Sequence, residues 1–291
     1  MGCAAGDRHP RGNGGARRGP RARALAGGKH AGTRVEGHGR ARRKRVVTAH
    51  GAADGAFERK LRGFGPLQEA DRRALAAIEA AARTVAPETD LVREGDRPEG
   101  IVVILDGFAC RYKLRRNGAR QIMAYLVPGD SCDLAASLPH RLDHAIGALS
   151  ACRVALIAPE TGRDLLQRPA IARALRNAAL AEEATLREWL VNIGRRSAVE
   201  RLAHLFCEMY VRLGAVGLTE GHRYMLPVTQ LDLADTTGMT SVHVNRSLGE
   251  LRRLGLIERK GKRLTILDLP RLMDVAEFQA DYLHLSQQAA I

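Results

Sequence analysis

The stretch 227–257 restricts the fold most, because it reads as two short helices joined by a glycine. Thr229 and Thr240 are typical helix N-caps, and Asp232 places a carboxylate in the first turn, where it favours the helix dipole. Gly238 lies where the first helix must end in a residue with positive φ. This pattern predicts a helix-turn-helix.

Apolar side chains supply an inward face for each of these helices. Val244, Leu248 and Leu251 recur at i, i+4 and i+7 in the second helix, which places them on one face. In the first helix the apolar contacts are expected from Leu231, Leu233 and Ala234.

The opposite face of the second helix carries polar side chains near its N-terminus, the end that enters a major groove. Arg can grip guanine O6 and N7, Asn can do the same for adenine, and Val can touch a thymine methyl. For His243, a phosphate contact and a packing role are equally supported. The residues predicted to contact DNA here are Thr229, Gln230, Thr240, Ser241, Val242, His243, Asn245 and Arg246.

A basic run follows this motif at 258–263 and leads into Leu264 and Ile266. It predicts a β-hairpin turning at Gly261. Lys260 and Lys262 at its tip are predicted to contact DNA phosphates, which would complete a winged domain.

Short β-rich runs separated by turn residues occupy residues 90–157 and predict a compact antiparallel barrel. Alternation in one run places Ile122, Ala124 and Leu126 on one face. A short helix is expected before the barrel, from Pro66 to Arg83.

Residues 163–193 are rich in Ala, Leu, Arg and Glu and predict one long helix. Its apolar stripe fits either an intrachain core or a parallel dimer seam. Gly194 interrupts the pattern as a candidate hinge, and Ser197 with Glu200 forms a capping box that starts another helix. The stripe consists of Leu175, Ala179, Leu186, Leu190 and Ile193.

The net charge of +14 comes mostly from the N-terminus. The first 50 residues hold 13 basic and 2 acidic residues, against 33 and 30 in the rest of the chain. Residues 1–55 have few large apolar side chains, so we expect them to be disordered. They form either an extension without function or a basic arm that attracts DNA nonspecifically.

Several classes of protein are disfavoured by what the sequence lacks. No apolar stretch is long enough to span a membrane, and no secretory signal is evident, so we expect a cytoplasmic protein. We find no P-loop, G-x-S-x-G or H-E-x-x-H, and we predict no enzyme and no cofactor. The cysteines Cys110, Cys132, Cys152 and Cys207 are expected to be buried, reduced thiols.

From about Phe64 to Leu269 the sequence resembles the Crp/Fnr family of bacterial transcription regulators. The specific match is TQLDLADTTGMTSVHVNRSLGELRRLGLI, and the segments REGDRPEGIVVILDGFACRY and LVPGD match the family's cyclic-nucleotide-binding-like β-roll. The resemblance implies a homodimer on a long central helix, with each recognition helix reading one half of an inverted repeat.

The sequence departs from the family's phosphate cassette, in which a Gly-Glu pair and an Arg-Ser pair hold a cyclic nucleotide. Asp133 and Leu134, then Asp143 and His144, stand at those positions, and Asp143 would repel a phosphate. We therefore expect no tight cyclic-nucleotide binding, although Arg141 lies close by. These five residues form the candidate effector pocket, and the effector itself is unknown.

We thus predict an α+β fold in five parts and an effector-gated, dimeric regulator that binds double-stranded DNA and, if it activates, RNA polymerase. The alternatives are a constitutive DNA binder with a vestigial sensor domain and a nucleotide-binding regulatory subunit that acts on proteins. The parts are a basic arm (1–55), a β-roll (64–160), a dimerisation helix (163–193), a winged helix-turn-helix (195–270) and a tail (271–291).

Overall fold

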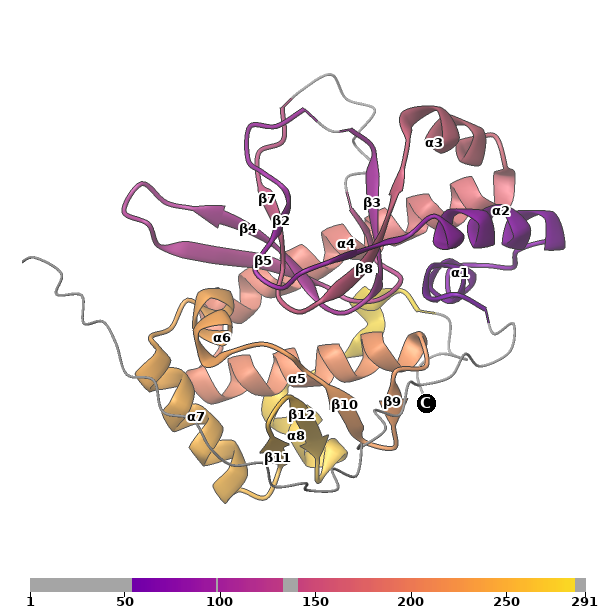
Figure 1. Ribbon diagram of the computed structural model, residues 1–291. Coiled ribbons are helices and arrows are strands. Elements are labelled where there is room, and N and C mark those ends of the chain that lie inside the picture. The colour runs from indigo at the N-terminus through magenta and orange to yellow at the C-terminus, as the bar shows by residue number, and fades with distance from the viewer. Residues whose placement is uncertain (1–53, 98, 133–140, 286–291) are drawn as a thin grey trace, which may run out of the picture. The chain divides into compact units, whose positions relative to one another are not determined.

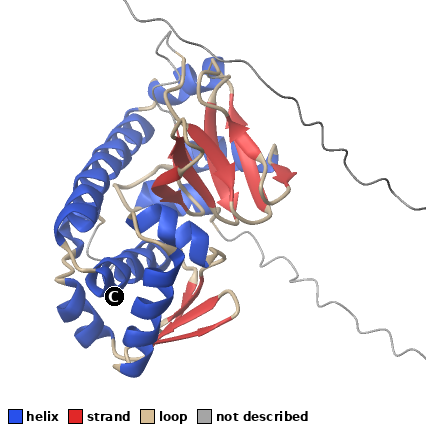
Figure 2. Ribbon diagram, turned by 90° about the vertical axis from the view of Figure 1, so that its left-hand side faces the viewer, coloured by secondary structure: helices blue, strands red, loops and turns tan. Residues whose placement is uncertain are grey.

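The structure is a computed structural model that describes residues 54–97, 99–132 and 141–285 (Figure 1). The predicted disorder of the arm falls almost wholly outside these residues. The elements form two groups, an N-terminal group built around two sheets and a C-terminal group built around one (Figure 2).

Two four-stranded antiparallel sheets form the predicted β-roll, in the orders β1-β8-β3-β6 and β2-β7-β4-β5. Their apolar side chains enclose a core that includes Ile104, Leu126 and Ile146. The strands are β1 (Arg83–Val85), β2 (Asp90–Val92), β3 (Ile101–Asp106), β4 (Ala109–Leu114), β5 (Arg120–Leu126), β6 (Ser131–Cys132), β7 (Ala145–Ala148) and β8 (Cys152–Ile157).

Strand β5 does not show the simple alternation that its sequence predicts. Its register with β4 pairs Ala124 with Arg111 but Ile122 with Tyr112, so Met123 is the extra residue of a β-bulge. The bulge shifts the phase of the strand. Ile122 consequently packs in another cluster than Leu126, and the prediction that Ile122, Ala124 and Leu126 share one face is wrong.

From residue 54 on, where the described part of the chain begins, two helices precede the β-roll, α1 (Ala56–Arg62) and α2 (Glu69–Ala80), and the sequence predicted only the second. The predicted single helix at 163–193 is two helices, α3 (Pro159–Leu166) and α4 (Pro169–Arg195). Pro169 lacks an N–H and stands in the first turn of α4, so it starts a helix and does not continue one.

The predicted break between the two helices is present but lies just after Gly194, because α4 continues to Arg195. The chain turns at the next two residues, and the capping box of Ser197 and Glu200 then starts α5 (Ala198–Ala215) as predicted. The Ser197 amide donates to Glu200 Oε2 at 2.8 Å, and the Glu200 amide donates to Ser197 Oγ at 3.4 Å.

The apolar stripe of α4 serves two surroundings. Ile171, Ala174 and Leu175 are buried against α1 and β3, within the chain's own core. Further along the helix, Leu186 is 55% exposed and Leu190 is 74% exposed. The start of α4 thus belongs to the intrachain core, which was one alternative. Its end is an exposed apolar surface, as the dimer seam would require.

The C-terminal group contains the predicted helix-turn-helix and wing, together with elements that the sequence did not predict. A third sheet has the order β11-β12-β10-β9, so the hairpin is half of a four-stranded wing. Residues 271–291, expected as a tail, contain most of α8 and a 3₁₀ helix. The elements are β9 (Thr219–Glu220), β10 (Arg223–Met225), α6 (Gln230–Thr237), α7 (Ser241–Arg253), β11 (Ile257–Lys260), β12 (Arg263–Ile266), α8 (Leu269–Ala276) and η2 (Ala280–Leu283).

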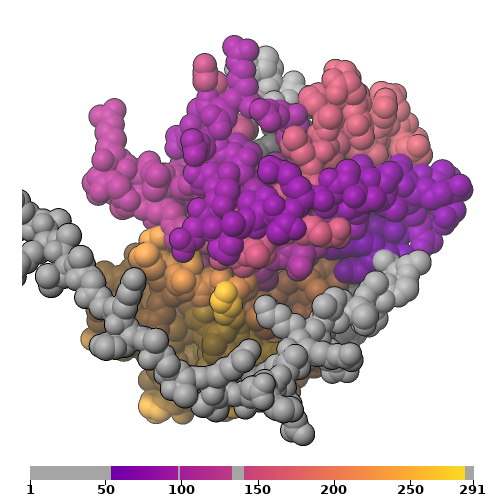
Figure 3. All heavy atoms as spheres, in the orientation of Figure 1, coloured from indigo at the N-terminus to yellow at the C-terminus, as the bar shows by residue number. Residues whose placement is uncertain are grey.

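One hydrophobic cluster joins the C-terminal group to the β-roll. Phe206 and Leu248 belong to the same cluster as Ile122 and Tyr125 of β5. Figure 3 shows the magenta strands and the orange helices in contact along one face. Strand β5 therefore contributes to two cores.

Candidate nucleic-acid interface and cavity

Local hydrogen bonds fix the start of α6 and the start of α7, and a left-handed glycine ends α6 at the turn between them. The Thr229 amide donates to Asp232 Oδ2 at 2.7 Å, and the Asp232 amide donates to Thr229 Oγ1 at 3.0 Å. Gly238 has φ 67° and ends α6 in the left-handed region, where a side chain would be strained. Thr240 Oγ1 accepts from the His243 amide at 3.3 Å. These contacts confirm the predicted helix-turn-helix.

Packing beneath the motif sorts the apolar residues as predicted, with one exception. Val244 and Leu251 of α7 are fully buried, and Leu233 of α6 is buried with them. Leu231 is 59% exposed, so the apolar contact predicted for it is wrong. It stands one residue after the exposed start of α6, on the side of the helix that faces solvent.

The predicted base-reading face of α7 is exposed. Ser241, Val242, Asn245 and Arg246 all point away from the core, with Val242 68% exposed. Among the described residues, the side chains of Asn245 and Arg246 have no hydrogen bond or ion pair. His243 is exposed too, which favours the phosphate contact over a packing role.

The other predicted DNA contacts flank this face. Thr229 and Gln230 are exposed at the start of α6, and Lys260 and Lys262 are exposed on either side of Gly261, which has φ 59°. Lys260 is 2.8 Å from Glu258, an exposed pair that costs little to break. Each of these predicted contacts is thus exposed, as a DNA contact requires.

Helix α6, by contrast, is tied to strand β5. Arg120 of β5 donates to Asp235 Oδ2 at 2.7 Å and also to Asp232. Burial opposes the charge of Arg120, but its hydrogen bonds with the two carboxylates outweigh burial and raise its pKa. The hydroxyls of Tyr125 and Thr236 lie 2.6 Å apart and are buried. No local pattern in the sequence indicates these contacts, because their partners are more than 100 residues apart.

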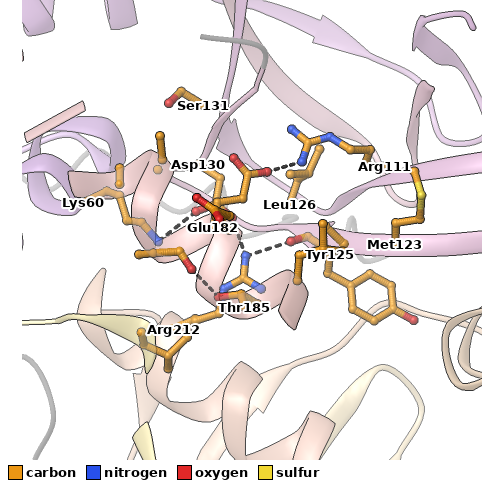
Figure 4. A pocket seen from close by; sticks show the side chains of 18 of the residues that line it. Lys60, Arg111, Met123, Tyr125, Leu126, Asp130, Ser131, Glu182, Thr185 and Arg212 are labelled. Carbon is orange, nitrogen blue, oxygen red and sulfur yellow. Dashed lines mark hydrogen bonds and ion pairs between the residues drawn. The ribbon is translucent and has the colours of Figure 1, made fainter. Parts of the chain in front are cut away.

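A cavity of about 420 Å³ lies between β5 and α4 (Figure 4). On one wall, Arg111 of β4 pairs with Glu182 of α4 and donates from Nε to His144 Nε2 at 3.1 Å. His144 Nδ1 in turn lies 2.7 Å from Asp143. This chain of polar contacts connects the β-roll directly to the long helix.

Another side of the cavity is formed by a buried ion-pair cluster. Asp130 lies 2.9 Å from Lys60 Nζ and 2.7 Å from Arg212 Nη2, and Arg212 also pairs with Glu208 at 2.9 Å. Burial alone would raise the pKa of Asp130, but the charges of Lys60 and Arg212 outweigh burial and hold that pKa below its ordinary value. Asp130 therefore stays ionised and joins α1, the β-roll and α5.

The predicted effector residues fall into three groups. Asp143 and His144 line the cavity. Arg141 does not line it, because it is exposed and donates to the Gly95 carbonyl at 2.7 Å. Asp133 and Leu134 lie outside the described residues.

Lys60, Arg111, Asp130 and Glu182 also line this cavity, and no pattern in the sequence predicts them. Glu182 lies on the helix whose sequence shows mainly an apolar stripe. Pairing it with Arg111 requires knowing that β4 and α4 meet in space, which the sequence pattern does not encode.

Cysteines and metal-binding groups add no second site within the described residues. Cys110, Cys152 and Cys207 are buried, free thiols, and Cys132 is buried too, as predicted. Burial raises the pKa of the Cys110 thiol to about 12, so it is protonated at neutral pH. No cluster of three His, Cys, Asp or Glu suited to a metal occurs in 54–97, 99–132 or 141–285. Over the same ranges no helix has the length and apolarity needed to cross a membrane.

Two family models match the chain. Residues 82–169 match the cyclic nucleotide-binding domain, and residues 200–275 match the Crp-like helix-turn-helix domain. Together they cover the β-roll and the region that holds α6, α7 and the wing.

Curated relatives are similar over most of their own length. The nitrogen fixation regulation protein FixK of Bradyrhizobium diazoefficiens is 34% identical over 175 residues, which cover 60% of this chain and 72% of that protein. The transcriptional activator protein FnrL of Cereibacter sphaeroides is 27% identical, covering 66% of this chain and 78% of that protein.

Solved structures share the fold. FixK2 from Bradyrhizobium japonicum superposes with a TM-score of 0.58 at 24% identity, over 67% of this chain and 96% of that chain. A transcriptional regulator of the CRP family from Thermus thermophilus superposes with a TM-score of 0.55 at 19% identity, over 67% of this chain and 97% of that chain.

Proposed function

The chain belongs to the Crp/Fnr family of DNA-binding transcription regulators, and from this premise we propose that it acts as a homodimer on an inverted-repeat site. Helix α7 of each protomer would read the bases of one half-site. An effector in the β-roll cavity would set the affinity for DNA.

The observation that carries the proposal is the exposed face of α7. Arg246 and Asn245 offer guanidinium and amide groups that have no partner among the described residues. Groups of this kind make two hydrogen bonds to guanine and adenine, respectively, in a major groove. The DNA backbone on either side of α7 would be bound by Thr229, Gln230, Lys260 and Lys262. These contacts would set the register of α7 on the duplex.

The exposed apolar side chains of α4 support the homodimer. Leu186 and Leu190 of the stripe, and Leu180 and Val191 of the same helix, are between 47% and 74% exposed, and exposing this much apolar surface is costly in a monomer. A second copy of α4 would cover it and place two recognition helices in one particle. Replacing Leu190 with Glu is expected to shift the protein towards monomer in sedimentation velocity and to weaken DNA binding.

Two features support gating by an effector. The cavity is large enough for a small molecule, and its walls belong to the β-roll and to α4. Strand β5 lines this cavity and also holds α6 through Arg120 and Tyr125. A ligand that displaces Glu182 from Arg111 would therefore alter the position of α4, the proposed dimer helix. It would also alter the contacts by which β5 holds α6.

The same ion pair supports the alternative, a constitutive regulator. Arg111 and Glu182 already connect the β-roll to α4 without a ligand. An Arg111→Gln variant separates the two proposals. If an effector gates the protein, DNA affinity changes in cell extract for the wild type and not for the variant. A constitutive regulator would show the same affinity with and without extract.

The name of FnrL as a transcriptional activator supports a further proposal, that this chain contacts RNA polymerase if it activates. We also propose that it has no enzymatic activity and works in the cytoplasm, since its function would require access to DNA.

The deciding experiment is selection from a randomised duplex library with the wild type and Arg246→Ala at one salt concentration. An enriched inverted repeat that loses its base preference in the variant is the expected result. Enrichment of a single unrepeated site would contradict the dimer. Absence of enrichment by the wild type, with and without cell extract, would contradict sequence-specific binding.

A further inference from the structure

A second cleft, of about 320 Å³, lies between the start of α6, the second half of α7 and strand β11 of the wing. Gln230 stands at one side and Gly261, at the turn of the wing, at the other. Leu248 and Ile257 are buried beneath it, and Arg252 and Arg259 complete the lining.

The cleft holds two guanidinium groups and no carboxylate. Arg252 donates from Nε to the Leu248 carbonyl at 3.1 Å, and Arg259 donates from Nη2 to the Val228 carbonyl. Neither arginine has an ion pair with an acidic residue in the described part of the chain. The Nε of Arg259 is buried and has no hydrogen-bond partner among the residues that the structure describes.

Such an arrangement is costly without a bound anion. Two positive charges converge on one cleft, and a buried donor with no acceptor loses the hydrogen bonds that water would supply. Desolvation lowers the pKa of Arg259, which shows that the protein's own groups do not compensate for burying it. The neighbouring Arg253 differs, because Glu250 pairs with it at the surface.

We propose that the cleft lined by Arg252, Arg259 and Gln230 binds a phosphate of the DNA backbone. Guanidinium groups match phosphate oxygens with paired hydrogen bonds, and the absence of a side chain at Gly261 leaves room for the sugar-phosphate chain. The cleft lies between Gln230 and the wing tip, both predicted to contact DNA. This inference rests on the proposed function and adds a contact that carries no sequence information.

The test is the salt dependence of binding to a fluorescent duplex, compared among wild type, Arg252→Gln, Arg252→Lys and Arg253→Gln. A dimer carries the cleft twice, so Arg252→Gln loses two phosphate contacts and lowers the magnitude of the slope of log affinity against log salt by about 1.8. Between about 50 and 200 mM salt, the difference in affinity between wild type and Arg252→Gln should therefore narrow by about twelvefold. Arg252→Lys should keep the slope of the wild type.

Arg253→Gln is the matched control, since it removes the same charge from the next residue of the same helix, outside the cleft. The loss caused by Arg252→Gln should be equal for all base sequences. Thermal unfolding of Arg252→Gln should match the wild type, because Arg252 is exposed.

Three results would overturn the proposal. Equal slopes for Arg252→Gln and Arg253→Gln, with the wild type still selecting an inverted repeat, would exclude the phosphate contact and leave the proposed function intact. Stabilisation of the wild type, and not of Arg252→Gln, by inorganic tripolyphosphate at micromolar concentration, without a change in slope, would identify a site for a free anion. A wild type that binds no duplex at any salt would overturn both proposals.

Discussion

Helices α6 and α7 belong to one motif, but their polar side chains have opposite surroundings. Asp232, Asp235 and Thr236 of α6 are bound by Arg120 and Tyr125 of β5. Asn245 and Arg246 of α7 face solvent without partners among the described residues. Side chains of α6 thus fix the motif to the protein, and those of α7 are left for an outside partner.

Arg246→Ala should produce the largest effect, on DNA affinity and not on stability. A bidentate contact to a base contributes about 1–3 kcal/mol of discrimination, and a dimer on an inverted repeat would lose it twice. The free energy of unfolding should change by less than about 0.5 kcal/mol, because the side chain is exposed. Quantitative binding to the selected site and urea unfolding measure the two effects. A large loss of stability in Arg246→Ala would mean that the side chains of α7 hold the motif to the rest of the protein, as those of α6 do.

Arg120→Ala should produce the reverse pattern. It leaves Asp232 and Asp235 without their cation in a largely buried contact, and we expect a loss of about 1–3 kcal/mol in the free energy of unfolding. Arg115→Ala, at the exposed tip of the same hairpin, is the control and should be near neutral. Urea unfolding checks both. If Arg120→Ala and Arg115→Ala had equal free energies of unfolding, β5 would not anchor α6.

Acidification should weaken the packing of α5 beneath the motif. His204 of α5 is buried, and burial, together with the nearby positive charge of Arg196, lowers its pKa to about 3. Glu188 lies 3.3 Å from His204 and is paired with Arg196 at 2.7 Å. Below about pH 6.5, the pKa of an unperturbed His, the unfolded chain binds a proton at His204 and the folded chain does not. This contribution to stability is complete above about pH 6.5 and is lost as the pH falls.

The loss can reach about 1.4 kcal/mol per pH unit below that point. Urea unfolding between about pH 6.5 and 5 should give a flatter profile for His204→Gln than for the wild type, whatever the variant's stability at neutral pH. His222→Gln is the exposed control and should keep the slope of the wild type. Paired carboxylates such as Asp130, whose pKa is lowered, contribute only nearer pH 4, outside this range.

Tyr125→Phe should produce the smallest effect, a loss of about 1 kcal/mol from one hydrogen bond. Thr236 keeps its bond to the Asp232 carbonyl at 2.7 Å, which limits the loss. Tyr112→Phe on the neighbouring strand removes an exposed hydroxyl that is bonded to Asp90, and should cost less. Unfolding midpoints rank the two variants. A larger loss for Tyr112→Phe would contradict the importance of the contact with α6.

Sequence predicted the motif itself well because its signals are local. Caps at Thr229 and Thr240, the left-handed Gly238 and the spacing of Val244 and Leu248 all act within a few residues. The wing turn at Gly261 is local in the same sense. Such signals specify each element before any tertiary contact forms.

The anchor and the cavity could not be predicted, because they depend on contacts between distant segments. Arg120 meets Asp235 across 115 positions, and Arg111 meets Glu182 across 71. The bulge at Met123 also changes which side of β5 each residue faces, and a periodicity of two cannot reveal it. The break before α4 was readable from Pro169, but the long apolar pattern on both sides outweighed it.

The bulge in β5 has a consequence for protein engineering. A chimera that joins this chain's C-terminal group to a relative's β-roll at the turn after Arg195 would lose the Arg120 and Tyr125 contacts, even with a correctly placed junction. Transplanting β4 and β5, bulge included, should restore them. Interchangeable modules in this protein are therefore not continuous stretches of sequence, since the unit that travels with the helix-turn-helix includes a strand encoded about a hundred residues earlier.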